Sequence, residues 1–341
     1  MSSTISSFSL STILRQTVMT AQTNLASAEQ EISTGRYADV GLQLGGQTGQ
    51  AVSLRSEESL LQTIVNSNTS VTTSLSSSQN VLTNLQSTAN NFLQSLIQGN
   101  NNASSATQLQ ATATTNLQSL LSELNTSVNG QHIFAGINTS VAPMTDNSSA
   151  VSTAFNTYLS GIGATSATIT PSQMQTFLSS SQFTSLFQSG AGGSWSNWSS
   201  ASDAPIVSQI SPNQTVTTSV SANQSAFQQL TQAYAMVADL GTSNLSSDTY
   251  NTLLNQATSV IQGAVSGLTG LQAGLGTAQS SITNANNYMS TQLSSLSTQI
   301  GALENVDTYS VSTQATQLQT QIETAYTLTA QLQQLSLTKY L

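Results

Sequence analysis

The sequence of 341 residues contains no cysteine. Disulfide bridges, thiolate metal sites and cysteine nucleophiles are therefore excluded from this chain. Histidine, another common metal ligand and general base, occurs once, at His132. A single histidine without clustered acids is more often structural than metal-binding, so we expect His132 to be a turn residue.

Charge is almost as scarce. Only 5% of the residues are charged, against roughly 25% in an average soluble domain. The sequence has four basic and thirteen acidic residues, which gives a formal net charge of -9. Binding to nucleic acid or to an anionic membrane surface needs a basic patch, and four scattered residues do not supply one. So few charges leave little repulsion between copies, and self-association is expected.

Long apolar runs are also missing. No stretch of about 18 apolar residues is present to span a bilayer as a helix. The first eleven residues are rich in Ser and Thr and carry no basic residue, and Arg15 interrupts the apolar positions that follow. We therefore expect neither a membrane-spanning helix nor a cleaved secretory signal peptide.

What the sequence does contain is a regular apolar pattern at both ends. Apolar residues recur at alternating spacings of four and three, which is typical of a coiled-coil seam. The first seam is Leu14, Val18, Ala21, Leu25, Ala28 and Ile32. The last is Val311, Ala315, Leu318, Ile322, Ala325 and Leu332, widened by Leu328 and Leu335. Each seam needs a partner that buries it, so we expect the two to pack together.

Further helices are predicted between these ends. Their ranges are 51–97, 109–128 (ending at Gly130), 222–241, 253–275 and 282–303. The first helix should end at Gly35, and residues 36–49 should be irregular. Five glycines in or just after the range 253–275 (Gly263, Gly267, Gly270, Gly274 and Gly276) predict close helix packing, since glycine weakens a free helix.

Proline marks a different region. All four prolines and both tryptophans fall within residues 141–221. The segments 167–170 and 215–220 favour strands, and 174–187 favours a helix. The sequence thus predicts a mainly α fold: a long antiparallel coiled-coil-like helical rod formed by both chain ends, with a small inserted domain containing β structure.

Three domains are predicted from this organisation. Residues 1–45 and 290–341 form a terminal coiled-coil domain for assembly. Residues 46–140 and 222–289 form a helical rod domain, and residues 141–221 form the insertion.

No motif predicts catalysis or cofactor binding. Glu57 and Glu58 are adjacent, so on a helix they point about 100° apart and cannot flank one substrate bond. Residues 45–49 are glycine-rich but lack the lysine of a phosphate-binding loop. Trp195 and Trp198 could form a sugar- or partner-binding face, but we expect them to anchor the core of the insertion. The sequence therefore predicts no enzyme, no cofactor and no metal site.

Three stretches resemble one family, the bacterial flagellin superfamily. Gln-Glu-Ile-Ser-Thr-Gly-Arg at residues 30–36 is similar to the end of that family's first helix. Residues 130–139, Gly-Gln-His-Ile-Phe-Ala-Gly-Ile-Asn-Thr, resemble its Gly-x-Tyr-Leu-Phe-Gly-Gly turn, with Pro143 following. Leu-Ser-Leu-Thr-Lys-Tyr-Leu at residues 335–341 resembles the Ser-Leu-x-x-Tyr-Leu terminus of the hook–filament junction proteins (hook-associated protein three). Residues 37–41 depart from the family's frequent Asp-Asp-Pro element.

The resemblance implies a structural subunit of the bacterial flagellum. Such a subunit is exported unfolded through the flagellar type III apparatus, without a cleaved signal peptide, and works outside the cell. Its terminal helices form the inner core of a tube, and its insertion faces outward. The implied partners are further copies in a ring or helical tube, a preceding hook-associated protein, flagellin, the filament cap protein and an export chaperone.

The residues predicted to carry function are therefore interface residues. Leu14, Val18, Leu25 and Ile32 are expected to face Leu318, Ile322, Leu332 and Leu335. We also expect the two ends to be disordered in the free monomer and to become ordered on assembly.

Two alternative functions remain open at this point. The chain could be a flagellin that forms the filament itself. From a different class, it could be a surface adhesin or glycan-binding protein that uses the inserted domain.

Overall fold

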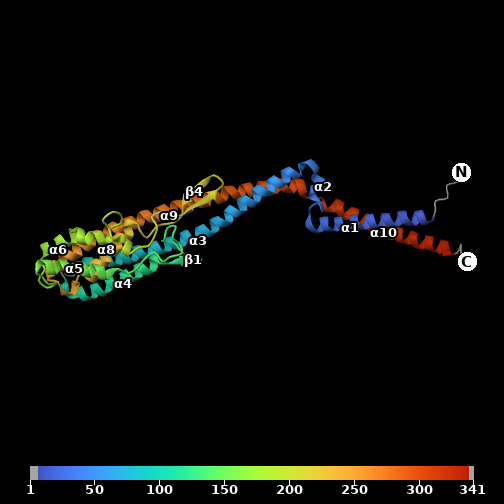
Figure 1. Cartoon of the computed structure of the whole chain (residues 1–341). Helices are drawn as coiled ribbons and strands as arrows, with labels where there is room; N and C mark the ends of the chain where they lie inside the picture. Colours follow the sequence, from blue (N-terminus) through green and yellow to red (C-terminus); the bar gives the residue numbers. More distant parts are fainter. Residues whose placement is uncertain (1–6, 101, 338–341) are drawn as a thin grey trace. The chain divides into compact units, whose positions relative to one another are not determined.

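The computed structural model describes residues 7–100 and 102–337, with the side chains of residues 9–100 and 102–331. Long helices occupy both ends of the chain, and two two-stranded sheets lie in the middle of the sequence (Figure 1). This confirms the predicted mainly α fold with a small β-containing insertion. By its internal contacts the chain divides into two compact units, Met1–Gln62 with Ser290–Leu341, and Thr63–Met289. The division into three domains stays a prediction.

The first unit contains both terminal helices. Its elements are α1 (Ser7–Thr34), α2 (Val40–Leu44), the 3-10 turn η1 (Gly45–Gln47), the start of α3 (Thr48–Gly99), the end of α9 (Ser247–Glu304) and α10 (Thr308–Leu337). As predicted, α1 ends at Gly35, which adopts a left-handed conformation (φ +69°) and donates its N–H to the Glu31 carbonyl at 2.8 Å. Glycine adopts this conformation at the least cost, so it commonly terminates helices.

The second unit contains the rest of α3 and α9 and every strand that the structure describes. Its other elements are η2 (Ala103–Ser105), α4 (Ala106–Leu124), β1 (Ser127–Val128), β2 (Gln131–His132), α5 (Ser148–Ile162), α6 (Pro171–Ser179), α7 (Ser181–Thr184), η3 (Ser185–Phe187), η4 (Trp195–Asn197), β3 (Val207–Ser211), β4 (Gln214–Thr217), α8 (Ser225–Asp239) and η5 (Thr242–Asn244). The helix predicted over residues 51–97 is confirmed as α3, and that over 222–241 corresponds to α8. The ranges 253–275 and 282–303, predicted separately, are parts of one continuous helix, α9.

The helix predicted to continue to Gly130 ends earlier. α4 stops at Leu124, and residues 127–132 form an antiparallel hairpin of β1 and β2. The two residues of its turn, Asn129 (φ 53°) and Gly130 (φ 78°), both have positive φ. An Asn-Gly pair is the favoured sequence for this tight turn, because both residues tolerate the left-handed region.

The insertion differs most from its prediction. Residues 167–170 do not form a strand but lead into α6, where the Thr170 side chain and Gln173 cap the first turn and Pro171 follows the cap. The strand predicted over 215–220 is partly right, since β4 ends at Thr217 and pairs with β3. The helix predicted over 174–187 is broken at Ser180 into α6, α7 and η3, and α5 was not predicted.

Close packing explains two of the five glycines for which it was predicted, all of which lie in α9. A side chain at Gly267 would place Cβ 2.9 Å from Cβ of Ala226, and one at Gly263 would lie 3.2 Å from the amide oxygen of Gln229, both on α8. At Gly270 and Gly274 nothing lies within 4 Å, and at Gly276 the nearest atom is Nε2 of Gln79 at 3.9 Å, an ordinary contact. The packing interpretation is therefore right for the first two and wrong for the others.

A buried asparagine joins the second unit's long helices to a strand. Asn68 of α3 is fully buried and donates from Nδ2 to the carbonyl of Ile210 on β3 at 2.9 Å and to Oδ1 of Asn286 on α9 at 2.7 Å. Because a buried amide needs partners, these bonds fix how α3, α9 and β3 align within this unit.

Candidate assembly interface

The terminal helices α1 and α10 pack together as an antiparallel pair. Ala28 of α1 is buried against Val311 and Ala315 of α10. Nearer the free end of the pair, the Gln22 side chain donates to the Tyr326 hydroxyl at 3.0 Å. The contact is built largely on small side chains, since Ala21, Ala28, Ala315 and Ala325 are all at most 8% exposed.

The predicted interface residues are only partly used by this contact. Leu318 is buried, whereas Leu14, Val18, Leu25 and Ile322 are half-buried and Ile32 is 39% exposed. Leu25 packs beside the Ala28 cluster. The side chains of Leu332 and Leu335 lie outside the described residues. The alanines of the same seams are buried, whereas most of the described leucines and isoleucines keep part of their surface exposed. Their role between copies stays a prediction.

Exposed apolar side chains concentrate in the first unit. Among the described residues, sixteen large apolar side chains are exposed, and ten of them belong to this unit, which comprises about a third of the chain. These are Leu10, Ile13, Met19, Ile32, Leu42, Val52, Leu60, Tyr309, Tyr326 and Leu328. Apolar surface gathered in this way commonly marks a site of protein–protein contact.

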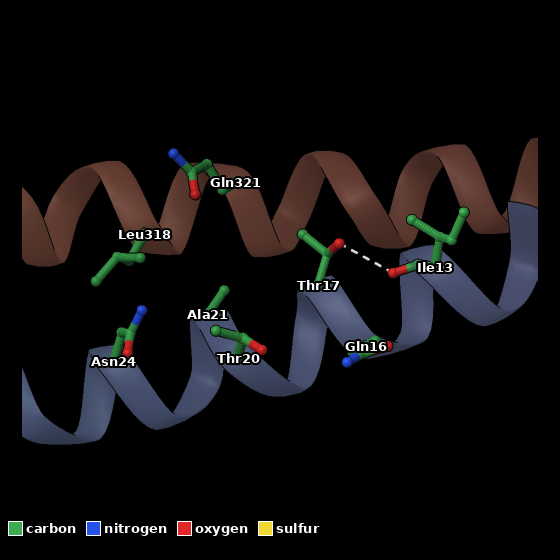
Figure 2. A pocket seen from close by; sticks show the side chains of 8 residues that line it. All are labelled: Ile13, Gln16, Thr17, Thr20, Ala21, Asn24, Leu318 and Gln321. Atoms are coloured by element: carbon green, nitrogen blue, oxygen red, sulfur yellow. Dashed lines mark hydrogen bonds between the residues drawn. The ribbon is translucent and has the colours of Figure 1, made fainter.

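A groove of about 300 Å³ runs between the two terminal helices. In Figure 2, Leu318 of α10 and Ala21 of α1 point toward each other across it. The other lining residues are Ile13, Gln16, Thr17, Thr20, Asn24 and Gln321. No lining side chain carries a charge, so this surface favours a neutral, partly apolar partner.

Two arginines of the first unit converge on one carboxylate. Glu304, at the end of α9, is 2% exposed and accepts hydrogen bonds from both Arg36 and Arg55; the Arg55 Nε bond measures 2.8 Å. The bond from Arg55 is the main reason that the pKa of Glu304 lies below its usual range, and the charges of both guanidinium groups add to this against the effect of burial. This ion triad could not be predicted from the sequence pattern.

The histidine, the tryptophans and the acid pair that the sequence analysis considered as possible catalytic or binding residues do not form such a site. His132 has a structural place, but in strand β2 and not in a turn, so the prediction of a turn residue is wrong; its Nδ1 lies 2.8 Å from the Asn125 carbonyl. Trp195 and Trp198 are at most 2% exposed, and their rings stack with centroids 6.5 Å apart, so they anchor the core and do not offer a binding face. Glu57 is exposed and Glu58 half-buried on α3.

Residues 7–100 and 102–337 offer no metal site and no membrane-spanning helix. No cluster of three or more His, Cys, Asp or Glu side chains there could hold a metal ion. None of the helices in these ranges combines the length and apolarity needed to cross a membrane.

One carboxyl in the second unit has a strongly perturbed pKa. Asp239 is the last residue of α8 and is half-buried, and its Oδ2 has no hydrogen-bond partner in the structure. Burial, with the charge of Asp146 adding to it, raises the pKa of Asp239 to about 7. The carboxylate also lies at the negative end of the α8 dipole, where an anion is unfavourable.

We predict that Asp239→Asn makes the protein more stable at pH 8 and changes little at pH 4. The folded pKa of about 7 exceeds the unfolded value of about 3.9. Between these values the folded state binds the extra proton, so stability falls as the pH rises. After discounting for solvent exposure, the gain at pH 8 should be about 1–2 kcal/mol. Urea unfolding followed by tryptophan fluorescence at both pH values measures it; an unchanged pH dependence in the variant would contradict the assignment.

Comparison with known proteins identifies the family. The model of the bacterial flagellin N-terminal helical region matches residues 5–139, and that of the bacterial flagellin C-terminal helical region matches residues 258–341. Both ends of the chain, with α1 and α10, therefore carry the family's sequence pattern. The chain belongs to the bacterial flagellin superfamily. This family is structural, and membership implies an extracellular flagellar component that self-assembles into polymers with other flagellar proteins.

The fold of this flagellin-superfamily chain is also found in a solved structure. A candidate flagellar hook-associated protein from Vibrio parahaemolyticus is 11% identical, with a TM-score of 0.54 over 76% of this chain and 97% of that one. The likeness concerns the fold. No curated protein matches the sequence.

The N-terminal family region ends in a tightly packed turn. Phe134 is fully buried, and its ring meets that of Phe227 on α8 edge-on at 5.8 Å. Gly136 has φ +60°, and a Cβ there would lie 2.4 Å from the Ser202 carbonyl oxygen and 2.8 Å from that of Ala204. The glycine of this flagellin-like motif is therefore required by the close approach of another backbone segment.

Proposed function

We propose that this chain is the subunit that joins the flagellar hook to the filament, assembling as a ring or helical tube through its terminal helices. The observation that carries the assembly role is the concentration of exposed apolar side chains in the first unit, on and around a helix pair with an uncharged groove. Such a surface is unfavourable in water and is stabilised when copies bury it against each other.

The junction role, rather than the filament role, is supported by the carboxyl terminus. The last seven residues resemble the Ser-Leu-x-x-Tyr-Leu ending of junction proteins. The fold of the Vibrio parahaemolyticus hook-associated protein, covered over 97% of its length, agrees with this. The partners would be a preceding hook-associated protein, flagellin, the filament cap and an export chaperone. The chain would reach the cell exterior through the flagellar export apparatus without a cleaved signal.

A strain that lacks this chain tests the proposal. We expect intact hooks, very few filaments, loss of swimming and flagellin monomer released into the medium, all restored by the wild-type chain. Filaments of normal number and length in the deletion strain would contradict the junction role. If the gene product is instead the main component of purified wild-type filaments, the chain is the filament flagellin, the alternative that the flagellin family matches favour.

A further inference from the structure

The end of α1 and the break between α9 and α10 are held together in the first unit. The Tyr37 N–H donates to the Glu304 carbonyl at 3.0 Å, and the Val306 N–H donates to the Gly35 carbonyl at 3.0 Å. Arg36 and Asn305 form an antiparallel β-bridge between these bonds. The chain therefore leaves α1 and enters α10 at one joint, next to the start of α3.

The ion triad of Arg36, Arg55 and Glu304 lies at this joint. Its members come from three segments: the residues after α1, the first turns of α3, and the last residue of α9. The triad uses two of the four basic residues of the whole sequence. Arg36–Glu304 and Arg55–Glu304 are also the ion pairs that the structure shows among its described residues.

Burying a carboxylate is energetically unfavourable. The carboxylate must be desolvated, and a neutral side chain of similar size often serves stability as well or better. An ion triad instead fixes the relative orientation of the segments that it joins, because the planar guanidinium group bonds a carboxylate in few geometries. The neighbouring α1–α10 contact, made of alanine and other small or uncharged side chains, supplies little direction of its own.

We propose that Arg36, Arg55 and Glu304 are positioning residues for assembly, which set how the α1–α10 pair is oriented on the adjoining ends of α3 and α9 within the first unit. The triad thereby fixes the angle at which one copy presents its terminal helices to the next. This inference rests on the proposed assembly role.

Three full-length variants test the inference in the deletion strain. Glu304→Gln removes the shared carboxylate, and a neutral triple variant (Arg36→Gln, Arg55→Gln, Glu304→Gln) removes all the charges together. Asp248→Asn is the matched control for Glu304→Gln, because Asp248 is an exposed acid of the second unit and its replacement changes the net charge by the same amount. The readouts are the amount of each variant in isolated hook–filament complexes, the filament count per cell, and the helical signal and tryptophan melting curve of the purified chain.

We expect Glu304→Gln and the triple variant to enter the complexes at less than a tenth of the wild-type amount. Their tryptophan melting curve should match wild type, because Trp195 and Trp198 lie in the second unit. Their helical signal should also match, because the triad is proposed to orient helices and not to form them. Asp248→Asn should incorporate normally. The triple variant separates orientation from charge balance, since it leaves no unpaired charge at the joint.

Several results would overturn the inference. Normal incorporation of Glu304→Gln, or rescue by the neutral triple variant, would show that the triad sets no orientation. Failure of Asp248→Asn as well would assign the effect to net charge, and loss of helical signal in the triple variant would assign it to stability. Absence of the wild-type chain from flagella would instead overturn the proposed function itself, so the two failures are distinguishable.

Discussion

Gly136→Ala is expected to destabilise the second unit by about 3 kcal/mol or more. Two effects add at this position. The left-handed conformation at φ +60° costs a non-glycine residue roughly 1–2 kcal/mol. In addition, the new Cβ would lie 2.4 Å from the Ser202 carbonyl oxygen and 2.8 Å from that of Ala204, and such a clash must be relieved by moving backbone, which typically costs a further 1–3 kcal/mol.

The backbone around Gly136 is not free to move. The Ser202 N–H donates to the Ala135 carbonyl at 2.9 Å, and the Ile137 N–H donates to the Ala204 carbonyl at 3.2 Å. A shift that relieves the clash would therefore break at least one of these bonds. Urea unfolding followed by tryptophan fluorescence measures the loss, because both tryptophans are buried in the same unit.

Gly130→Ala is the matched control for this prediction. Gly130 also has positive φ (+78°), but nothing lies within 4 Å of the position that a Cβ would take there. Only the conformational cost applies at this residue, so we expect a loss of about 1 kcal/mol. Equal losses for the two variants would show that the close approach at Gly136 contributes nothing.

The terminal helices were the most predictable part of the fold. Their apolar residues recur at spacings of four and three, which is easily recognised because the sequence has few other regular patterns. A helix with one apolar seam must also bury that seam against a partner. The sequence did not reveal that the alanines of the two seams would be among their most buried residues. Ala28 and Ala315 occupy seam positions, but a side chain's size decides how near two helices approach only once a partner is known.

The ion triad could not be predicted for a different reason. Glu304 lies 268 residues from Arg36 and 249 from Arg55 along the chain. No local pattern connects residues so far apart. The scarcity of basic residues was a weak clue: with four in the whole sequence, any acid that pairs with two of them, as Glu304 does, has a specific role.

In the insertion, local signals were present but were outweighed by strand propensity. Thr170, Pro171 and Gln173 form a capping sequence that starts α6, whereas the β-branched residues just before it favoured a strand. Val151, Phe155 and Leu159, all buried on α5, recur every fourth residue, a helical spacing within reach of sequence reasoning. β3 was not predicted, although the Pro212-Asn213 pair that joins it to β4 is a local turn signal.

The central claim is that the first unit is buried by neighbouring copies in the flagellum. Ile13 on α1 lines the groove between α1 and α10 and is 56% exposed in the single chain. Ile97 on α3 is 59% exposed in the second unit and serves as the matched control. Because the chain has no cysteine, Ile13→Cys and Ile97→Cys each introduce the protein's single thiol.

The decisive measurement is the rate of thiol labelling in the free chain and in isolated hook–filament complexes. Labelling rates depend on access to the thiol, so burial between copies should slow them. We predict that the cysteine at position 13 reacts at least about tenfold more slowly in the complexes than in the free chain, whereas the cysteine at position 97 reacts at similar rates in both. Equal labelling of the position 13 thiol in the two states would contradict the claim that α1 and α10 form the assembly interface.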